Sequence, residues 1–208
     1  MLLIVLVHVV ALLIGSIPVG YLVGKVRGVD VRLHGSGNIG ATNIGRTLGK
    51  AAGVVTLCGD VAKGMAAVLL VHLPLLANLS AEQISACRAT LGLCAIIGHC
   101  FSPFLRFKGG KGVATGLGVF LLLAPVETTI ATCVFALVLK VSGYVSLGSI
   151  SSVLVLTLLL ALEQFSRANP SLMLAGLITA LIIVGRHRAN IQRLLSQTEQ
   201  KFSFKRAN

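Results

Sequence analysis

Apolar residues run along this chain in long, nearly uncharged stretches, separated by short loops that carry Gly, Lys and Arg. A helix needs about 20 apolar residues, within a range of about 17–25, to cross a bilayer. Pro125 and Glu127 divide the stretch 113–142 at what we expect to be a tight turn. The pattern therefore predicts membrane-spanning helices at 2–24, 51–73, 86–104, 113–125, 128–142, 145–163 and 170–186.

This pattern predicts an all-α polytopic membrane protein with seven spans, or five if 113–142 does not cross twice. No polar stretch is long enough to fold separately, so we expect residues 1–208 to form a single integral-membrane domain. Composition agrees, because 55% of the residues are hydrophobic and only 12% are charged. An ordinary soluble domain has about 25% charged residues, so lipid must solvate this chain.

The charge of the chain is large and one-sided. The formal net charge is +12, and seven spans place 15 of the 18 Lys and Arg residues on one side. Counted with the acids, that side carries about +13 and the other about −1, so the positive-inside rule predicts an external N-terminus and a cytoplasmic C-terminus. With no Trp and two Tyr, the chain lacks the stacking groups of a nucleic-acid binder. Anionic lipid or phosphorylated small molecules fit the basic side better.

The first loop on the basic side contains the pattern G-x-G-x-x-G from Gly35 to Gly40. A dinucleotide site needs that pattern after a strand, whereas here it follows a transmembrane helix. A flexible linker is the other simple interpretation, but a linker does not need the polar residues that this loop carries. Glycines let backbone N–H groups approach an anion, and Ser and Arg can complete the cradle. The candidate residues are Ser36, Asn38, Thr42, Asn43 and Arg46.

The second loop reads Lys108-Gly109-Gly110-Lys111-Gly112 directly before a predicted helix. The spacing of a Walker A loop is absent. Helix N-termini bind anions through free N–H groups and the helix dipole. The positive-inside rule alone explains the two lysines but not the three glycines, so this loop is predicted to bind phosphate.

Two further groups of polar residues are candidates. His187 and Asn190 lie three residues apart and are expected to share a helix face, where the imidazole could donate to phosphate or act as a general base. A lipid-facing basic run is the alternative for that segment. Asp60 and Lys63, in the second span, form either a self-contained pair or a brace for the loops above.

Several mechanisms lack support. The chain has no G-x-S-x-G elbow, and no His is followed five residues later by Asp. A covalent or His–Asp acyl transfer is therefore not indicated. Cys94, His99 and Cys100 lack a fourth ligand for zinc, so we expect no metal site.

The strings GSGNIGATNIGR, DVAKG, GHCFSPFLRFKGGKGVATG and RHRANIQRLL occur in this order. Together they resemble the bacterial acyl-phosphate-dependent glycerol-3-phosphate acyltransferases, the PlsY family. The resemblance implies seven membrane helices and transfer of an acyl group from acyl phosphate to the 1-hydroxyl of sn-glycerol 3-phosphate. The products would be lysophosphatidate and phosphate, and neither acyl-CoA, a metal nor another cofactor would be used.

The resemblance also implies roles for individual residues. Ser36, Arg46, Lys111, His187 and Asn190 are the expected catalytic set, and Glu199 would brace the tail. Ser146 is a weaker candidate for substrate binding. One departure is that the tail has Gln197 where we expect a glycine nearby. Either His187 or a phosphate of the substrate could be the base.

The expected location is the bacterial cytoplasmic (inner) membrane, with the site on the cytoplasmic face. Acyl phosphate, glycerol 3-phosphate and membrane lipid are the expected partners, with a functional link to a soluble enzyme that makes acyl phosphate. Two other functions compete with this interpretation. A transporter of an organic phosphate would show broken helices and polar groups at mid-membrane, and a lipid-binding scaffold would not need the clustered glycines.

Overall fold

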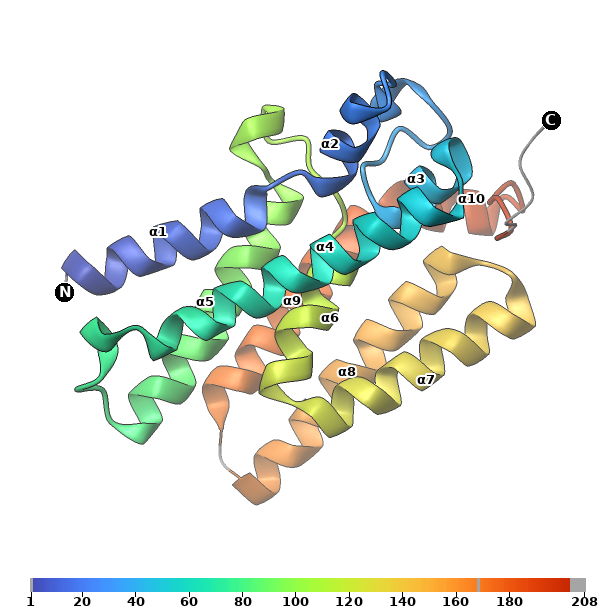
Figure 1. The fold of residues 1–208 in the computed structure, drawn as a ribbon. Coiled ribbons are helices and arrows are strands. Elements are labelled where there is room, and N and C mark those ends of the chain that lie inside the picture. The colour runs from blue at the N-terminus through green and yellow to red at the C-terminus, as the bar shows by residue number, and fades with distance from the viewer. Residues whose placement is uncertain (1, 168, 203–208) are drawn as a thin grey trace.

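A computed structural model describes residues 2–167 and 169–202, and each regular element in that part of the chain is helical. The predicted all-helical fold is thus confirmed for these residues (Figure 1). The α-helices are α1 (Leu2–Ser16), α2 (Val19–Val26), α3 (Ala41–Leu48), α4 (Lys50–Leu69), α5 (Ala81–Cys100), α6 (Val113–Leu123), α7 (Pro125–Ser142), α8 (Val145–Arg167), α9 (Pro170–Arg186) and α10 (Arg188–Leu195). Short 3-10 turns occur at Val31–Leu33, Leu70–His72, Pro74–Leu76 and Pro103–Leu105.

Helices occupy all seven regions that the hydropathy pattern selected. Among the described residues, four are long and apolar enough to cross a membrane alone, beginning at Lys50, Ala81, Pro125 and Val145. The pairs α1 with α2 and α9 with α10 are bent by 42° and 58°, and counting each pair as one span raises the number to six. Helix α6, with 11 residues, is shorter than a span. The number of crossings and the orientation of the termini therefore remain predictions.

The first predicted span, 2–24, is broken where we expected continuity. Helix α1 ends at Ser16 and α2 begins at Val19, because Pro18 has no N–H to donate within a helix. The break leaves carbonyl groups inside the bundle that need donors. The Ser16 carbonyl accepts a hydrogen bond of 2.7 Å from Ser102 Oγ, and the Ile17 carbonyl accepts one of 2.9 Å from Lys63 Nζ.

The turn between α6 and α7 also differs from the expected one. The chain turns at Ala124, and Pro125 is already the first residue of α7 rather than part of the turn. Proline suits this position, because the first helical N–H has no intrahelical acceptor and the ring fixes a helical φ.

Small residues set how closely the helices pack. Helix α1 packs against α5, and α4 packs against α6. A Cβ added at Gly15 would overlap the backbone of Ala95, and one added at Gly64 would overlap the backbone of Thr115. Close backbone approach of this kind is typical of helices packed in a membrane.

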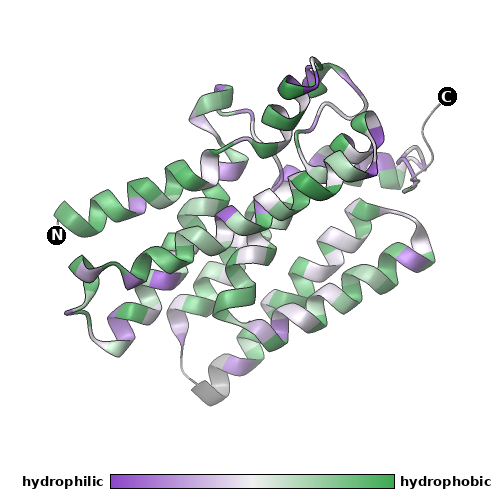
Figure 2. Cartoon of the chain, in the orientation of Figure 1, coloured by the Kyte–Doolittle hydropathy of each residue, from purple (hydrophilic) through white to green (hydrophobic). Residues whose placement is uncertain are grey.

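Apolar side chains cover the outside of the bundle. Leu137, Leu158 and Leu181 are each more than half exposed. Figure 2 shows hydrophobic residues along the middle of the helices and many of the hydrophilic residues toward their ends. A soluble protein of this size rarely leaves so much apolar surface uncovered, so the surface fits contact with lipid tails.

Three of the sequence motifs lie at one end of the bundle, which we call the motif face and define as residues 27–49, 101–112 and 186–202. Figure 1 shows α2, α3, α10 and the C-terminal segment at this end, and the N-terminus and the α4–α5 connection at the opposite end. Lys205 and Arg206, which the charge count assigned to the basic side, lie outside the described residues.

The C-terminal tail turns sharply after α10. Gln197 N–H donates to the Leu194 carbonyl, and Thr198 N–H donates to the Arg193 carbonyl at 2.8 Å, which is the pairing of a Schellman motif. This motif needs a left-handed residue, and Gln197 has φ 58°. Glycine usually occupies such a position, which accounts for the glycine expected near residue 197.

Replacing Gly98 by Ala should destabilise the fold, whereas replacing Gly185 should not. A Cβ at Gly98 would lie 2.8 Å from Ser16 Oγ and would overlap the Leu12 carbonyl, but one at Gly185 meets no atom within 4 Å. Overpacking of this kind costs about 1–3 kcal/mol. Thermal unfolding of both variants in detergent measures the difference, and equal midpoints would contradict the close α1–α5 contact.

Replacing Gln197 by Gly should relieve strain in the tail turn. A left-handed conformation costs a non-glycine residue about 1–2 kcal/mol, so the glycine variant should unfold at a slightly higher temperature than the parent chain. A Gln197→Val variant, which tolerates this φ poorly, should unfold at a lower temperature. If valine and glycine gave the same midpoint, the left-handed turn would be wrong.

Candidate functional site

Asn43 organises the first loop of the motif face. Its side chain is buried, and its Nδ2 donates to the carbonyls of Val31, His34 and Asn38 at 2.8–3.2 Å. Its Oδ1 accepts the backbone N–H of Ser36 at 2.9 Å. These polar contacts are internal, so in this state Asn43 shapes the loop rather than facing a ligand. Asn38 likewise uses its Oδ1 to accept the N–H of Gly40 at 2.8 Å.

Ser36 lies in the loop before α3, and Arg46 lies in the last turn of α3. Ser36 is exposed, and Arg46 is half-buried. The Arg46 guanidinium donates to the carbonyl of Gln200 at 3.1 Å and to that of Lys201 at 3.4 Å. Arg46 therefore joins the first loop to the C-terminal tail, across more than 150 residues of sequence.

The Gly109-Gly110 segment is packed against the end of α5. Gly109 N–H donates to the Cys100 carbonyl at 3.2 Å, and Gly110 N–H donates to the His99 carbonyl at 3.0 Å. A Cβ at Gly109 would overlap the His99 carbonyl, and one at Gly110 would overlap the His99 ring. This loop is predicted to bind phosphate, but in this state the N–H groups of Gly109 and Gly110 point into the protein. Their small size matters here for packing.

Arg186, which was not among the predicted site residues, holds the other side of the same segment. Its Nε donates to the Gly110 carbonyl at 3.0 Å, and its Nη2 donates to the Gly109 carbonyl at 2.8 Å. The guanidinium also lies 5.5 Å from the centre of the Phe101 ring. The only hint in the sequence was its position beside His187, within a basic run that equally suits a membrane surface.

Lys111 and Gly112 lead from the loop into α6. Gly112 has φ 87°, a conformation that favours glycine, and α6 begins at the next residue. The first N–H groups of a helix have no intrahelical acceptor and carry the positive end of its dipole, so this turn can receive an anion. Lys111 Nζ donates to Asn190 Oδ1 at 2.6 Å.

Glu199 is the centre of a hydrogen-bond network that reaches Lys111. Its Oε1 accepts from Asn190 Nδ2 at 2.6 Å and from Ser146 Oγ at 2.7 Å, and its Oε2 accepts from Arg193 Nε at 2.7 Å. Although burial opposes it, these hydrogen bonds hold the pKa of Glu199 below its usual value. The carboxylate thus links α8, α10 and, through Asn190, the Lys111 loop.

Cations surround this carboxylate. Burial lowers the pKa of Lys111 to about 8, and the positive charges of Arg193, Arg186 and Arg46 act in the same direction, while Glu199 opposes them. Four cationic side chains therefore act on one partly buried space. Glu199 contacts Arg193 directly and reaches Lys111 through Asn190. The arrangement has positive charge to spare for an anionic ligand.

His187 lies between α9 and α10 and is buried. It caps the junction rather than sitting within a helix, so the expectation of a shared helix face with Asn190 holds only loosely. Its Nδ1 lies 2.8 Å from the Ile183 carbonyl, which can only accept, so Nδ1 carries a hydrogen. Burial, together with the charge of Lys111, lowers the pKa of His187 to about 4. A neutral ring leaves Nε2 free to accept a proton.

The remaining candidates are placed as follows. Thr42 is half-buried in the first turn of α3, and Lys108 is exposed; the described hydrogen bonds to Glu199 come from Ser146, Asn190 and Arg193 and from neither of these two. Asp60 and Lys63 do not form a self-contained pair. Lys63 Nζ lies 2.8 Å from Asp60 Oδ1 and also 2.8 Å from His99 Nδ1. In the part of the chain that the structure describes, no group of three His, Cys, Asp or Glu residues could hold a metal ion.

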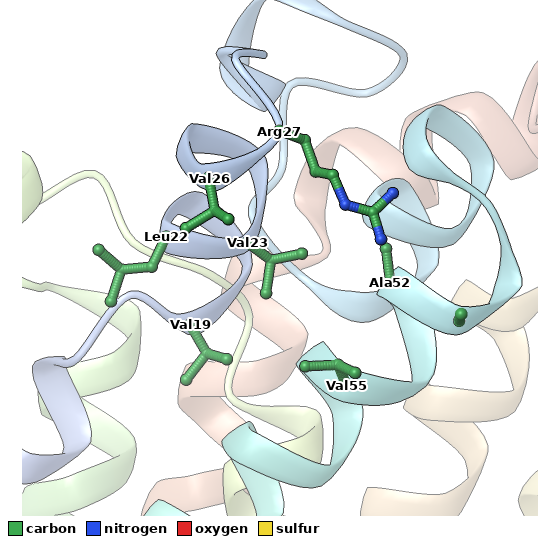
Figure 3. Close-up of a pocket in the computed structure, with 8 residues that line it drawn as sticks. Val19, Leu22, Val23, Val26, Arg27, Ala52 and Val55 are labelled. Atoms are coloured by element: carbon green, nitrogen blue, oxygen red, sulfur yellow. The ribbon is translucent and has the colours of Figure 1, made fainter.

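An apolar groove of about 330 Å³ lies between α2 and α4, separate from these polar groups (Figure 3). Valine and leucine side chains form most of its wall, and Arg27 extends across its rim toward Ala52. None of the residues predicted to bind phosphate lines it. The groove therefore suits hydrocarbon, and the Glu199 network with the α6 N-terminus is the candidate site for anions.

Comparison with known proteins identifies the family of this chain. Residues 5–197 match the family model described as glycerol-3-phosphate acyltransferase. The chain is 47% identical over 192 residues to a glycerol-3-phosphate acyltransferase of Trichlorobacter lovleyi, covering 92% of this chain and 94% of the relative. It is 44% identical over 204 residues to the corresponding protein of Desulforudis audaxviator, covering 98% of both.

Solved structures show the same fold. The crystal structure of PlsY (YgiH), an integral membrane glycerol 3-phosphate acyltransferase, in its glycerol 3-phosphate form, superposes with a TM-score of 0.85 at 33% identity and covers 96% of both chains. Its lysophosphatidic acid form gives a TM-score of 0.83 at 32% identity, covering 97% of this chain and 96% of that one. The chain is an integral membrane enzyme that belongs to the glycerol-3-phosphate acyltransferase family.

Proposed function

We propose that this enzyme transfers an acyl group from acyl phosphate to the 1-hydroxyl of sn-glycerol 3-phosphate, at the motif face and on the cytoplasmic side of a bacterial inner membrane. The observation that carries the proposal is the excess of cations around Glu199. One partly buried space beside the N-terminus of α6 is positively charged by four side chains, those of Arg46, Lys111, Arg186 and Arg193. Two phosphorylated substrates would supply the negative charge that this space lacks.

The chemistry requires positioning more than covalent catalysis. The acceptor hydroxyl oxygen attacks the acyl carbonyl carbon, a new ester C–O bond forms, and the C–O bond to phosphate breaks. Inorganic phosphate leaves with the electron pair, and the hydroxyl proton passes either to His187 Nε2 or to a substrate phosphate. Because acyl phosphate is already activated, the protein chiefly aligns the reactants and stabilises negative charge.

The residues predicted to be catalytic each have a task in this scheme. Lys111 and the α6 N-terminus bind one phosphate, and Ser36 with Arg46 binds the other. Asn190 holds Lys111 in place, since the two side chains are joined at 2.6 Å. Glu199 and Ser146 fix Asn190 from behind. Both terminal nitrogens of the Arg46 guanidinium donate to Gln200 or Lys201, so Arg46 must exchange tail acceptors for phosphate oxygens when substrate binds.

Purified protein in lipid vesicles should convert acyl phosphate and glycerol 3-phosphate into lysophosphatidate and phosphate, and should form no lysophosphatidate from acyl-CoA. Ser36→Ala, Arg46→Ala, Lys111→Ala and His187→Ala should each lower kcat/KM on the order of 100-fold without unfolding the protein. Exposed Lys140, on α7, provides a Lys140→Ala control that keeps parental turnover. A folded parent chain that transports glycerol 3-phosphate but makes no product would favour the transporter instead.

Activity should depend on the charge of Lys111. Its pKa of about 8 means that the ammonium is present below that pH and lost above it. The value of kcat/KM, which reports the free enzyme, should therefore fall as the pH rises through about 8. Lys111→Arg should remove this decline, since a guanidinium stays protonated throughout the range. An unchanged decline in the arginine variant would show that another group titrates.

A further inference from the structure

A buried polar cluster lies directly behind the glycine loop, and the proposed chemistry gives it no role. Asp60 and Lys63 come from α4, and His99 comes from the last turn of α5. Their side chains are between 2% and 5% exposed. Buried ionisable groups in a membrane protein are costly and usually serve a purpose.

The hydrogen bonds of the cluster fix the orientation of the His99 ring. Lys63 Nζ lies 2.8 Å from Asp60 Oδ1, 2.9 Å from the Ile17 carbonyl and 2.8 Å from His99 Nδ1. An ammonium group only donates, so His99 Nδ1 accepts and Nε2 carries the hydrogen. The ring is thereby tied to α4 and to the break between α1 and α2.

The opposite edge of the same ring supports Gly110. A Cβ built on Gly110 would overlap His99 Nε2 and would lie 2.8 Å from Cε1. The backbone of His99 contributes as well, because its carbonyl accepts the Gly110 N–H at 3.0 Å. The height of the glycine loop above the bundle is therefore set by a ring that Lys63 and Asp60 hold in place.

The position of the loop determines the position of the N-terminal end of α6, which can bind an anion. Arg186 holds the Gly109 and Gly110 carbonyls from above, so the segment is fixed on both sides. Lys111 and the first turn of α6 follow within three residues. A shift of about 1 Å in such a segment is enough to weaken a charged contact and to misplace a reactant.

We propose that Asp60, Lys63 and His99 are positioning residues, which hold the Gly109-Gly110 loop at the height where Lys111 and the α6 N-terminus bind a substrate phosphate. The proposal rests on the proposed function for the identity of that phosphate. The three residues touch no substrate and act through the loop. Their effect should therefore appear in KM for a phosphorylated substrate rather than in kcat.

The contact between His99 and Gly110 allows a matched test. In His99→Asn, the amide oxygen can replace Nδ1 as the acceptor for Lys63, while the ring edge against Gly110 is removed. In His99→Gln, the longer amide keeps atoms against Gly110 instead. Each change is combined with Gly110→Ala, and KM and kcat are measured for both substrates, with thermal unfolding as a check on the fold.

Gly110→Ala alone should raise KM for a phosphorylated substrate roughly tenfold, and His99→Asn alone should raise it less. In the His99→Asn background, Gly110→Ala should raise KM roughly fivefold less than it does in the parent chain, because the alanine methyl group then has space. The His99→Gln background should give no such relief. If the alanine has the same effect in the parent, asparagine and glutamine backgrounds, the positioning role is wrong.

A second measurement does not depend on turnover. Inorganic phosphate should raise the unfolding temperature of the parent chain, should do so less for Gly110→Ala, and should regain part of the effect in His99→Asn/Gly110→Ala. If phosphate stabilised the parent chain and these variants equally, while the parent chain made lysophosphatidate, only the positioning role would be overturned. If phosphate stabilised the variants in the expected order but the parent chain made no lysophosphatidate, the proposed reaction would be overturned and the positioning role would stand.

A further variant is available if His99→Asn fails to fold. Asp60→Asn weakens the ion pair without adding bulk, so it should still raise KM and leave kcat unchanged. An unchanged KM in Asp60→Asn overturns the positioning role.

Discussion

The carbonyl groups freed at the break between α1 and α2 must find donors inside the bundle, and much of the architecture follows from how they do so. Pro18 ends the first helix within the membrane region, where an unsatisfied carbonyl costs several kcal/mol. Ser102 and Lys63 supply the donors from two other segments of the chain. The charge that Lys63 brings is balanced by Asp60, so one backbone break explains a buried ion pair.

Charge balance explains the motif face in a similar way. Glu199 is placed by three donors, two from α10 and one from α8, and it organises Asn190, Ser146 and Arg193 rather than neutralising the whole region. The surplus of Arg and Lys is tolerated because the segments lie at the end of the bundle, where water screens part of the repulsion. This arrangement differs from a structural salt-bridge network, in which acids and bases are matched and little capacity for an anion remains.

The sequence predicted the helices well, because long apolar stretches can be solvated only by lipid, and it predicted three motifs that do meet at one face. It predicted the break in the first helix poorly, although Pro18 was visible, because apolar composition on both sides suggested continuity. The roles of Arg186 and His99 could not be predicted, since they come from contacts with Gly109 and Gly110 that span many residues. Asn43 was selected as a polar loop residue, but only the folded loop shows that its amide is used internally.

The tail contact of Arg46 has a consequence for how the protein is made. By the time a ribosome has added residue 195, all the helices that the structure describes have been synthesised, and so have both glycine loops. Glu199, Gln200 and Lys201 come afterwards, and they join α3, α8 and α10 through side-chain and backbone contacts. Phe202 then donates to the Gly143 carbonyl at 2.7 Å, which ties the tail to the α7–α8 turn. Because these tail residues are synthesised last, the polar centre can be completed only after the helices that it joins have been made.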